Sequence, residues 1–320
     1  MKLLGMMMLL MTALAHGAAS AGQRQKVLLD FDLGNDIDDA FALALVLSSP
    51  ELELAAVTLD HGRTDLRALV ACRMLYECGC EKIPVAVGRQ TAQIVGKDQE
   101  PAPYHPQYYW AKDFTAVKPV STPAADLIIH LLNRYSGEIV LITTGPVPNM
   151  ADVAAKDAGA LKKAKAIYAM FGSFYMGYGR DPAPSAEWNV AADVASAKTF
   201  VEAGAEITYA GLDITTFVAL EEKNRNRLLM RQSPLTNALC GLYSLWELET
   251  PILYDAVAVG MLLWPELFVT RPAHVRVLDN GFTVIDESKP ANGRIGVHIQ
   301  KDEFIKRLMQ RLLQQNLHRR

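Results

Sequence analysis

Short apolar runs alternate with helical patterns along the chain from residue 27 onward. Strands are predicted for residues 27–29, 52–59 and 83–87, and helices for residues 41–47 and 64–78. The first of these helices is apolar on every side, which predicts that it is buried in the body of the protein. A regular alternation of strands and helices is typical of a parallel sheet that is covered by helices on both faces.

Residues 90–118 interrupt this alternation with three prolines, several aromatic residues and His105. A long loop inside a compact domain is usually functional or disordered, and we favour a loop that covers a substrate over simple packing against the sheet. The alternation then resumes, with helices predicted at 123–135, directly after the turn at 145–149, at 191–202, mostly over 221–247, at 252–263 and from 302, and strands at 138–143, 166–170, 207–210, 275–278, 282–285 and 293–299. No linker or repeat divides the chain, so we predict one α/β domain over residues 22–320, with a Rossmann-like, open and mainly parallel sheet.

Five carboxylates lie between the first strand and the first helix, namely Asp30, Asp32, Asp36, Asp38 and Asp39. Two like charges about 4 Å apart repel by roughly 4 kcal/mol at an effective dielectric constant near 20. The nearest basic residues in the sequence, Lys26 and Arg63, lie outside this strand–turn–helix unit. The helix N-terminus favours one or two of the acids, with Asp38 or Asp39 expected as its cap. Aspartates at a strand end or a helix cap alone are commonly structural, but the whole group is best explained by a hard cation, Ca²⁺ or Mg²⁺, with oxygen ligands.

Polar segments also follow later predicted strands, at residues 143–149 and 170–189. Ligands of open α/β sheets bind beyond the carboxyl ends of the strands. These two segments can therefore converge with Asp30 and Asp32 on one edge of the sheet.

The overall charge excludes a general attraction to nucleic acid or to anionic membranes, since the formal net charge is −3 and the pI is about 6.2. Residues 1–21 are typical of a secretory signal peptide, with Lys2, an apolar stretch at 3–15 and a small-residue cleavage site before Gly22. An uncleaved anchor is the alternative, but the apolar stretch is short for a spanning helix. We expect an exported protein, periplasmic or secreted, without membrane association after cleavage.

The four cysteines, Cys72, Cys78, Cys80 and Cys240, match no zinc-binding pattern. Export permits a disulfide between Cys72 and either Cys78 or Cys80. Buried free thiols are the other interpretation, and the sequence does not decide between them.

Four short motifs resemble those of the nucleoside hydrolases of the inosine–uridine-preferring type, in the same order along the chain. The first is Asp30 to Ala40, similar to an Asp-x-Asp-x-Gly stretch that ends in Asp-Asp-Ala, with two extra residues that add Asp36. The others are Gly145-Pro146-Val147-Pro148-Asn149, Ala186-Glu187-Trp188-Asn189 and Tyr254-Asp255 before an apolar helix. The resemblance extends from Val27 nearly to the C-terminus, and four motifs in one order are far more specific than any one of them.

The resemblance implies hydrolysis of the N-glycosidic bond of a nucleoside or another riboside by a Ca²⁺-dependent enzyme. The implied Ca²⁺ ligands are Asp32, both oxygens of Asp39, the main-chain carbonyl of Pro148 and Asp255. Asp32 would also be the general base for a water whose pKa the metal lowers, and Asp30 would support the ligands from behind. The implied substrate-binding residues are Asp38, Asp181, Glu187, Asn189 and Met170. A homo-oligomer is also common in this family.

The sequence departs from the family pattern where the leaving group would be activated. Tyr254 stands in place of a histidine that protonates the base in purine-cleaving members, and a tyrosine with its usual pKa near 10 is a poorer acid at neutral pH. Asp181 and Arg63 each align with an asparagine near the sugar. Tyr254 is the predicted catalytic residue on this side, with His105 and Tyr243 as other candidates for the acid. We therefore expect an unusual base or aglycone.

Two other interpretations remain open. A haloacid-dehalogenase-like phosphatase would use Asp30 as nucleophile, but Gly34 and the Asp38-Asp39 pair do not fit that pattern. A non-catalytic exported protein that binds nucleosides or sugars through the metal site would explain the altered positions, and lack of turnover would distinguish it.

Overall fold

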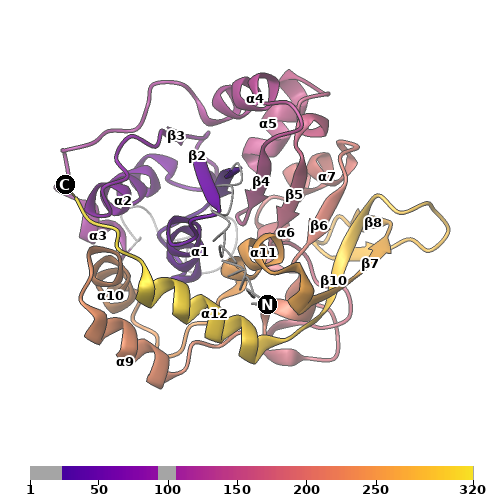
Figure 1. Ribbon diagram of the computed structural model, residues 1–320. Coiled ribbons are helices and arrows are strands. Elements are labelled where there is room, and N and C mark those ends of the chain that lie inside the picture. The colour runs from indigo at the N-terminus through magenta and orange to yellow at the C-terminus, as the bar shows by residue number, and fades with distance from the viewer. Residues whose placement is uncertain (1–23, 93–105, 320) are drawn as a thin grey trace, which may run out of the picture.

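The computed structural model describes residues 24–92 and 106–319, and one eight-stranded sheet runs through it (Figure 1). The strand order is β3-β2-β1-β4-β5-β6-β10-β7, and only β7 runs antiparallel to its neighbour. The strands are β1 (Gln25–Phe31), β2 (Leu52–Leu59), β3 (Val85–Val87), β4 (Val140–Thr143), β5 (Ala166–Ala169), β6 (Ile207–Tyr209), β7 (Phe268–Ala273) and β10 (Gly293–Ile299). The predicted single α/β domain with an open, mainly parallel sheet is confirmed.

Helices cover both faces of the sheet (Figure 1). One face carries α1 (Asp38–Leu47), α2 (Thr64–Glu77), α10 (Pro234–Trp246), α11 (Tyr254–Leu263) and α12 (Lys301–Gln314). The other face carries α4 (Ala124–Arg134), α5 (Pro148–Lys156) and α7 (Val194–Glu202). Shorter or peripheral helices are α3 (Tyr108–Ala111), α6 (Trp188–Ala192), α8 (Leu212–Thr215) and α9 (Glu222–Arg231).

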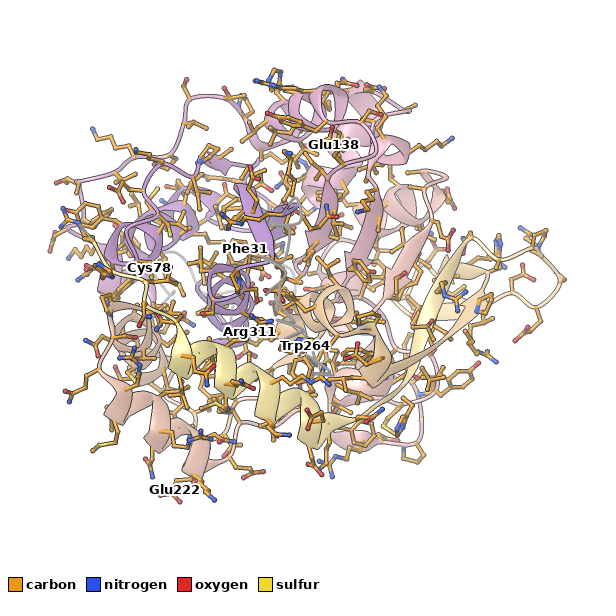
Figure 2. The ribbon with its side chains drawn as sticks, viewed as in Figure 1. Phe31, Cys78, Glu138, Glu222, Trp264 and Arg311 are labelled. Atoms are coloured by element: carbon orange, nitrogen blue, oxygen red, sulfur yellow. The ribbon has the colours of Figure 1, made fainter. Side chains whose placement is uncertain are left out.

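The two faces of β1 belong to two different hydrophobic cores. Val27, Leu29 and Phe31 pack on the side of α1 and α11, whereas Leu28 packs on the side of α4 and α5. This division follows from the alternation of side chains along a strand. Figure 2 shows Phe31 inside the molecule and Glu138 at its periphery, consistent with their burial. The end of β1 is therefore fixed on both sides.

Helices α1 and α11 pack side by side on the same face of the sheet. Their sequences are apolar around the whole circumference, and most of their residues are buried. A helix that is apolar on every side packs against neighbouring elements all round, so its position in the core is fixed. Their N-termini, and the acidic residues there, are consequently held in place.

Four sequence predictions differ from the structure in detail. Strand β7 was not predicted, because its residues 268–273 alternate with exposed positions and include Pro272 on the sheet's outer edge. The strands expected near 275 and 282 form a separate hairpin, β8 (Val275–Val277) with β9 (Thr283–Ile285). The helix expected at 191–202 is divided at Asp193, whose side chain caps α7. Helix α11 begins two residues late, because Ile252 pairs with Ala219 instead.

Two predictions concern residues that the structure does not describe, and the structure answers the questions of disulfides and of membrane-spanning helices. The signal peptide at residues 1–21 and His105 lie outside the described residues. All four cysteines are free thiols, so the possible disulfide is not formed. Among the residues that the structure describes, no helix has both the length and the apolar character needed to cross a membrane.

Gly260 tests the close packing of α11. A Cβ atom at this position would collide with the ring of Phe304 in α12, so Gly260→Ala should overpack the core and lower the free energy of unfolding by about 1–3 kcal/mol. Urea denaturation measures this change. Gly159→Ala is the matched control, because its nearest neighbour would be Asp157 Oδ1 at an ordinary 3.5 Å. Equal stability of both variants would contradict the packing described for α11.

Candidate active site

A cavity of about 460 Å³ opens at the carboxyl ends of the parallel strands. Strand β1 lies between β2 and β4, so the chain winds away in opposite directions on its two sides, and ligands bind at such a switch point. The cavity has a buried floor, lined by Asp32, Asp38, Asp39, Thr144, Met170, Glu187, Asn189 and Asp255. It has a more open mouth, lined by Asn35, Asp36, Pro106, Tyr178, Trp188, Trp246, Glu247, Leu248 and Tyr254.

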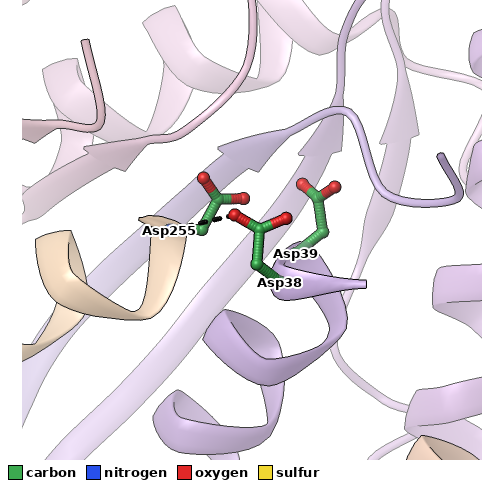
Figure 3. Close-up of side chains that lie close together, drawn as sticks. All are labelled: Asp38, Asp39 and Asp255. Carbon is green, nitrogen blue, oxygen red and sulfur yellow. Dashed lines mark hydrogen bonds between the residues drawn. The ribbon is translucent and has the colours of Figure 1, made fainter. Parts of the chain in front are cut away.

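Three buried aspartates meet at the floor, and their side chains lie close together in Figure 3. A carboxylate oxygen from each of Asp38, Asp39 and Asp255 lies within 4.8 Å of the others. Asp38 and Asp39 begin α1, and Asp255 is the second residue of α11, whose main-chain N–H donates to Asp38 Oδ2 at 3.2 Å. Two positive helix ends thus face the same acids.

Burial raises the pKa of all three carboxyls well above the usual value, and the neighbouring carboxylates raise it further. The expected capping role is wrong, however. Ile37 occupies the cap position, and neither Asp38 nor Asp39 makes a side-chain capping bond at the start of α1. Their carboxylates are directed to the cavity floor instead, together with Asp255.

Asp32 reaches the same floor from the loop after β1. Its Oδ2 lies 3.7 Å from the Arg67 guanidinium, which is almost fully buried. Arg67 also donates to the main-chain carbonyls of His61, at 2.9 Å, and of Asp32. The sequence did not indicate a basic partner for the aspartates between β1 and α1. Arg67 lies in the first turns of α2, which the fold brings beside Asp32. That part of α2 is buried beneath the site loops.

Asp30 supports the loop from behind the floor. Its carboxylate accepts hydrogen bonds from Thr58 at 2.6 Å, from Thr143 at 3.2 Å and from Asn149 at 2.7 Å. These donors come from β2, β4 and α5, so Asp30 joins three elements. It is fully buried, and burial raises its pKa. A nucleophilic role for Asp30, as in a phosphatase, is not supported by this position.

Asp60 was missed in the sequence. It directly follows β2, is fully buried and lies beside Asp30; burial, then the charge of Asp30, raises its pKa well above the usual value. A lone aspartate after a strand gives little signal in a sequence. Its neighbour becomes evident only when β1 and β2 are paired in register, with Asp30 opposite Thr58.

Glu187 and Asn189 line the floor of the same cavity as the three aspartates. Glu187 caps α6, accepting from Asn189 N at 2.8 Å and from Gly172 N at 2.9 Å. Burial raises its pKa to about 7. The Asn189 amide donates to the main-chain carbonyls of Thr144 and Met170 at 3.0 and 2.9 Å. Both side chains are therefore fixed where they line the cavity.

Aromatic side chains surround the mouth. Tyr254 and Tyr178 meet edge to face, with ring centroids 6.2 Å apart. The Tyr178 hydroxyl accepts from the main-chain N–H of Trp188 at 2.8 Å, and the Trp188 ring packs edge to face against His61. Burial and then the charge of Asp38 raise the pKa of the Tyr254 phenol. Tyr254 therefore stays neutral and is a weak acid.

Some residues expected at the site do not line the cavity. Asp181 is exposed, and its carboxylate accepts from Ala183 N in a local turn. Arg63 pairs with Asp65 at 2.7 Å near the surface. Pro148 is buried as the first residue of α5, and Tyr243 donates to the Glu249 carbonyl. The ligand role of Pro148 and the substrate role of Asp181 remain predictions.

The floor fits a hard cation. Asp39 Oδ1 is buried and has no hydrogen-bond partner within the described part of the chain. Arg67 supplies the cationic partner of Asp32, while the charge of Asp38 adds to burial in raising the pKa of both Asp39 and Asp255. Buried carboxylates of this kind require protons or a metal ion, and oxygen ligands suit Ca²⁺ or Mg²⁺.

The comparisons with known proteins agree with this geometry. A family model described as inosine-uridine preferring nucleoside hydrolase matches residues 27–306. The chain is 29% identical to the pyrimidine-specific ribonucleoside hydrolase RihA of Enterobacter sp. (strain 638), over 90% of this chain and 97% of that protein. It is 27% identical to uridine nucleosidase 1 of Arabidopsis thaliana, over 82% of this chain and 81% of that protein.

The solved structures that resemble this chain are also nucleoside hydrolases. A plant nucleoside hydrolase, the PpNRh1 enzyme, superposes with a TM-score of 0.77 at 25% identity, covering 91% of this chain and 99% of that one. A purine-preferring ribonucleoside hydrolase from Gardnerella vaginalis shares the fold, with a TM-score of 0.77 over 90% of this chain and 98% of that one. The family is metal-dependent and acts on ribonucleosides. The chain belongs to the inosine-uridine preferring nucleoside hydrolase family and is an enzyme that cleaves N-glycosidic bonds.

Proposed function

We propose that this enzyme hydrolyses ribosides to ribose and a free base or other aglycone, with Ca²⁺ as the cofactor and Asp32 as the general base. The observation that carries the proposal is the group of buried carboxylates Asp38, Asp39 and Asp255, which face a cavity large enough for a nucleoside. A phosphatase or a purely structural acid cluster would not need Glu187 and Asn189 fixed at the floor of the same cavity.

Asp32, Asp39, Asp255 and the main-chain carbonyl of Pro148 would hold the cation. Bound there, it supplies a positive charge for the ribose diol and lowers the pKa of a nearby water. Asp32 would take the proton from that water, with its orientation set by Arg67. Arg67 also places a positive charge 3.7 Å from the Asp32 carboxylate.

Asp38, Glu187 and Asn189 would bind the sugar hydroxyls. All three are buried and line the floor, so their hydrogen bonds to a sugar would form in a site with little competing water. Cleavage of an N-glycosidic bond passes through an oxocarbenium-like state, as in glycoside hydrolysis. Carboxylates fixed around the sugar stabilise the positive charge that develops at the anomeric carbon.

Removal of the metal or of a ligand tests the proposal. Treatment with EDTA, Asp32→Asn and Asp39→Asn should each lower kcat for sugar release at least about a hundredfold, since each removes a charge that acts in the transition state. A reducing-sugar assay on purine and pyrimidine ribosides measures this. Asp302→Asn, an exposed residue of α12, is the matched control. Ligand binding without turnover by the Ca²⁺-loaded wild type would favour a binding protein instead.

The pH dependence of stability tests the ligand assignment. The folded-state pKa values of Asp39 and Asp255 are raised above the ordinary value of 3.8, mainly by burial. Their protons therefore stabilise the metal-free fold below pH 3.8, and this contribution is lost as the pH rises through the folded-state values. Calcium requires ionised ligands. The difference in Tm between Ca²⁺ and EDTA should thus increase between about pH 5 and about pH 8.

Thermal scans at several pH values measure this difference. Asp39→Asn should flatten the dependence, because the amide does not titrate. Asp302→Asn should leave it unchanged. A Ca²⁺-induced shift in Tm that is equally large at every pH would show that the buried carboxylates are not the ligands.

A further inference from the structure

Two carboxylates at the mouth of the cavity have no role in the proposed hydrolysis. Asp36 and Glu247 both line the mouth, and neither is a proposed metal ligand or sugar-binding residue. The residues of the described chain that line this cavity include seven acids and no lysine, arginine or histidine. A divalent cation would neutralise only part of this charge. The mouth therefore retains a negative potential that an aglycone would meet.

Asp36 is held rigidly in that position. Its Oδ1 accepts from the main-chain N–H of Ile37 at 2.6 Å, and its carboxylate accepts a hydrogen bond from the Trp246 side chain. The buried Gln107 amide donates to the carbonyls of Asn35 and Asp36 at 3.1 and 2.8 Å. Hydrogen bonds from Gln107 thus hold the main chain at Asn35 and Asp36, and the Asp36 carboxylate lies beside the indole of Trp246.

The mouth is also lined by aromatic side chains. Tyr178 and Tyr254 meet edge to face there, and Trp188 and Trp246 line the same opening. Glu247 ends α10 in the left-handed conformation, at φ 65°, so its side chain lies at the opening together with Trp246. Aromatic faces and carboxylates both attract a flat cation, the former through the ring quadrupole.

We propose that the mouth selects ribosides whose aglycone is a cationic N-heterocycle, such as a pyridinium ring, bound by Asp36 and Trp246. This inference rests on the proposed function, because it takes the sugar to be bound at the floor. Asp36 is then a specificity-determining residue. It lies between Gly34 and Asp38, where this chain has two residues more than the motif that this segment resembles.

A cationic aglycone also suits the chemistry available here. When the C1′–N bond breaks, its electron pair passes to the ring nitrogen and neutralises the positive charge, so the leaving base needs no proton. Water forms the new C1′–O bond, and the proton that it loses passes to Asp32. The products are ribose and a neutral base. No histidine is required at the position of Tyr254.

The test compares how the purified enzyme, supplied with Ca²⁺, hydrolyses ribosides with a cationic aglycone and ribosides with a neutral one. Nicotinamide riboside is the cationic substrate, and uridine and inosine are the neutral ones. Asp36→Asn retains an oxygen that can accept from Ile37 and Trp246 but removes the charge. It should lower kcat/KM for nicotinamide riboside about tenfold or more and for the neutral ribosides less than about threefold. Asp302→Asn, exposed on α12, should change neither.

A second measurement separates recognition from leaving-group reactivity. The 1-methylnicotinamide cation and neutral nicotinamide have the same ring and lack the sugar, so each probes the mouth alone. The cation should inhibit wild type more strongly than nicotinamide does, and Asp36→Asn should remove the difference. Thermal unfolding of each variant confirms that it is folded.

Three outcomes would overturn the inference. An equal loss for cationic and neutral ribosides in Asp36→Asn would make Asp36 a loop-positioning residue only. Good turnover of uridine or inosine with none of nicotinamide riboside would reject the cationic aglycone and leave the proposed function intact. No turnover of any riboside would reject the proposed function, and the inference with it.

Discussion

The structure depends on one electrostatic constraint, the burial of several carboxylates where β1 ends and where α1 and α11 begin. Asp38, Asp39 and Asp255 are almost fully buried, and a buried, uncompensated charge is among the most costly features a fold can contain. The protein compensates part of this cost with two helix N-termini and with Arg67. The remainder is left for a cation. The buried carboxylates therefore lower the stability of the metal-free fold and favour the binding of a cation.

The rest of the fold keeps these groups from relaxing away from one another. Most residues of the two helices that carry them are buried. Asp30 ties β1 to β2, β4 and α5 through three hydrogen bonds. An acidic cluster on mobile loops would spread apart in solvent, and its pKa values would return to normal. Rigid elements at the edge of a parallel sheet prevent that, which also explains why ligands of such folds bind at this edge.

The sequence predicted those parts of the site that a single segment encodes. The period of the apolar residues identified β1, α1 and most of the sheet, and the group of five aspartates between Asp30 and Asp39 led to the prediction of a metal site. It did not reveal Arg67 or Asp60, because their meaning depends on the pairing of β1 with β2 and the packing of α2. Strand β7 was missed because an edge strand is half exposed and lacks a continuous apolar run. Long-range neighbours are set by topology, which local patterns do not contain.

Floor and mouth are also built from different kinds of structure, and this separates reaction from specificity. The floor comes from strand ends and helix starts, whereas much of the mouth comes from the loop at Asp36, the end of α10 and the segment around Tyr178. Loops tolerate insertion and substitution far better than the elements they connect. Relatives named as pyrimidine-specific and as non-specific match nearly the whole chain, so a shared fold accommodates different aglycones. A change of aglycone therefore needs only a changed mouth, and the role proposed for Asp36 would be such a change in this chain.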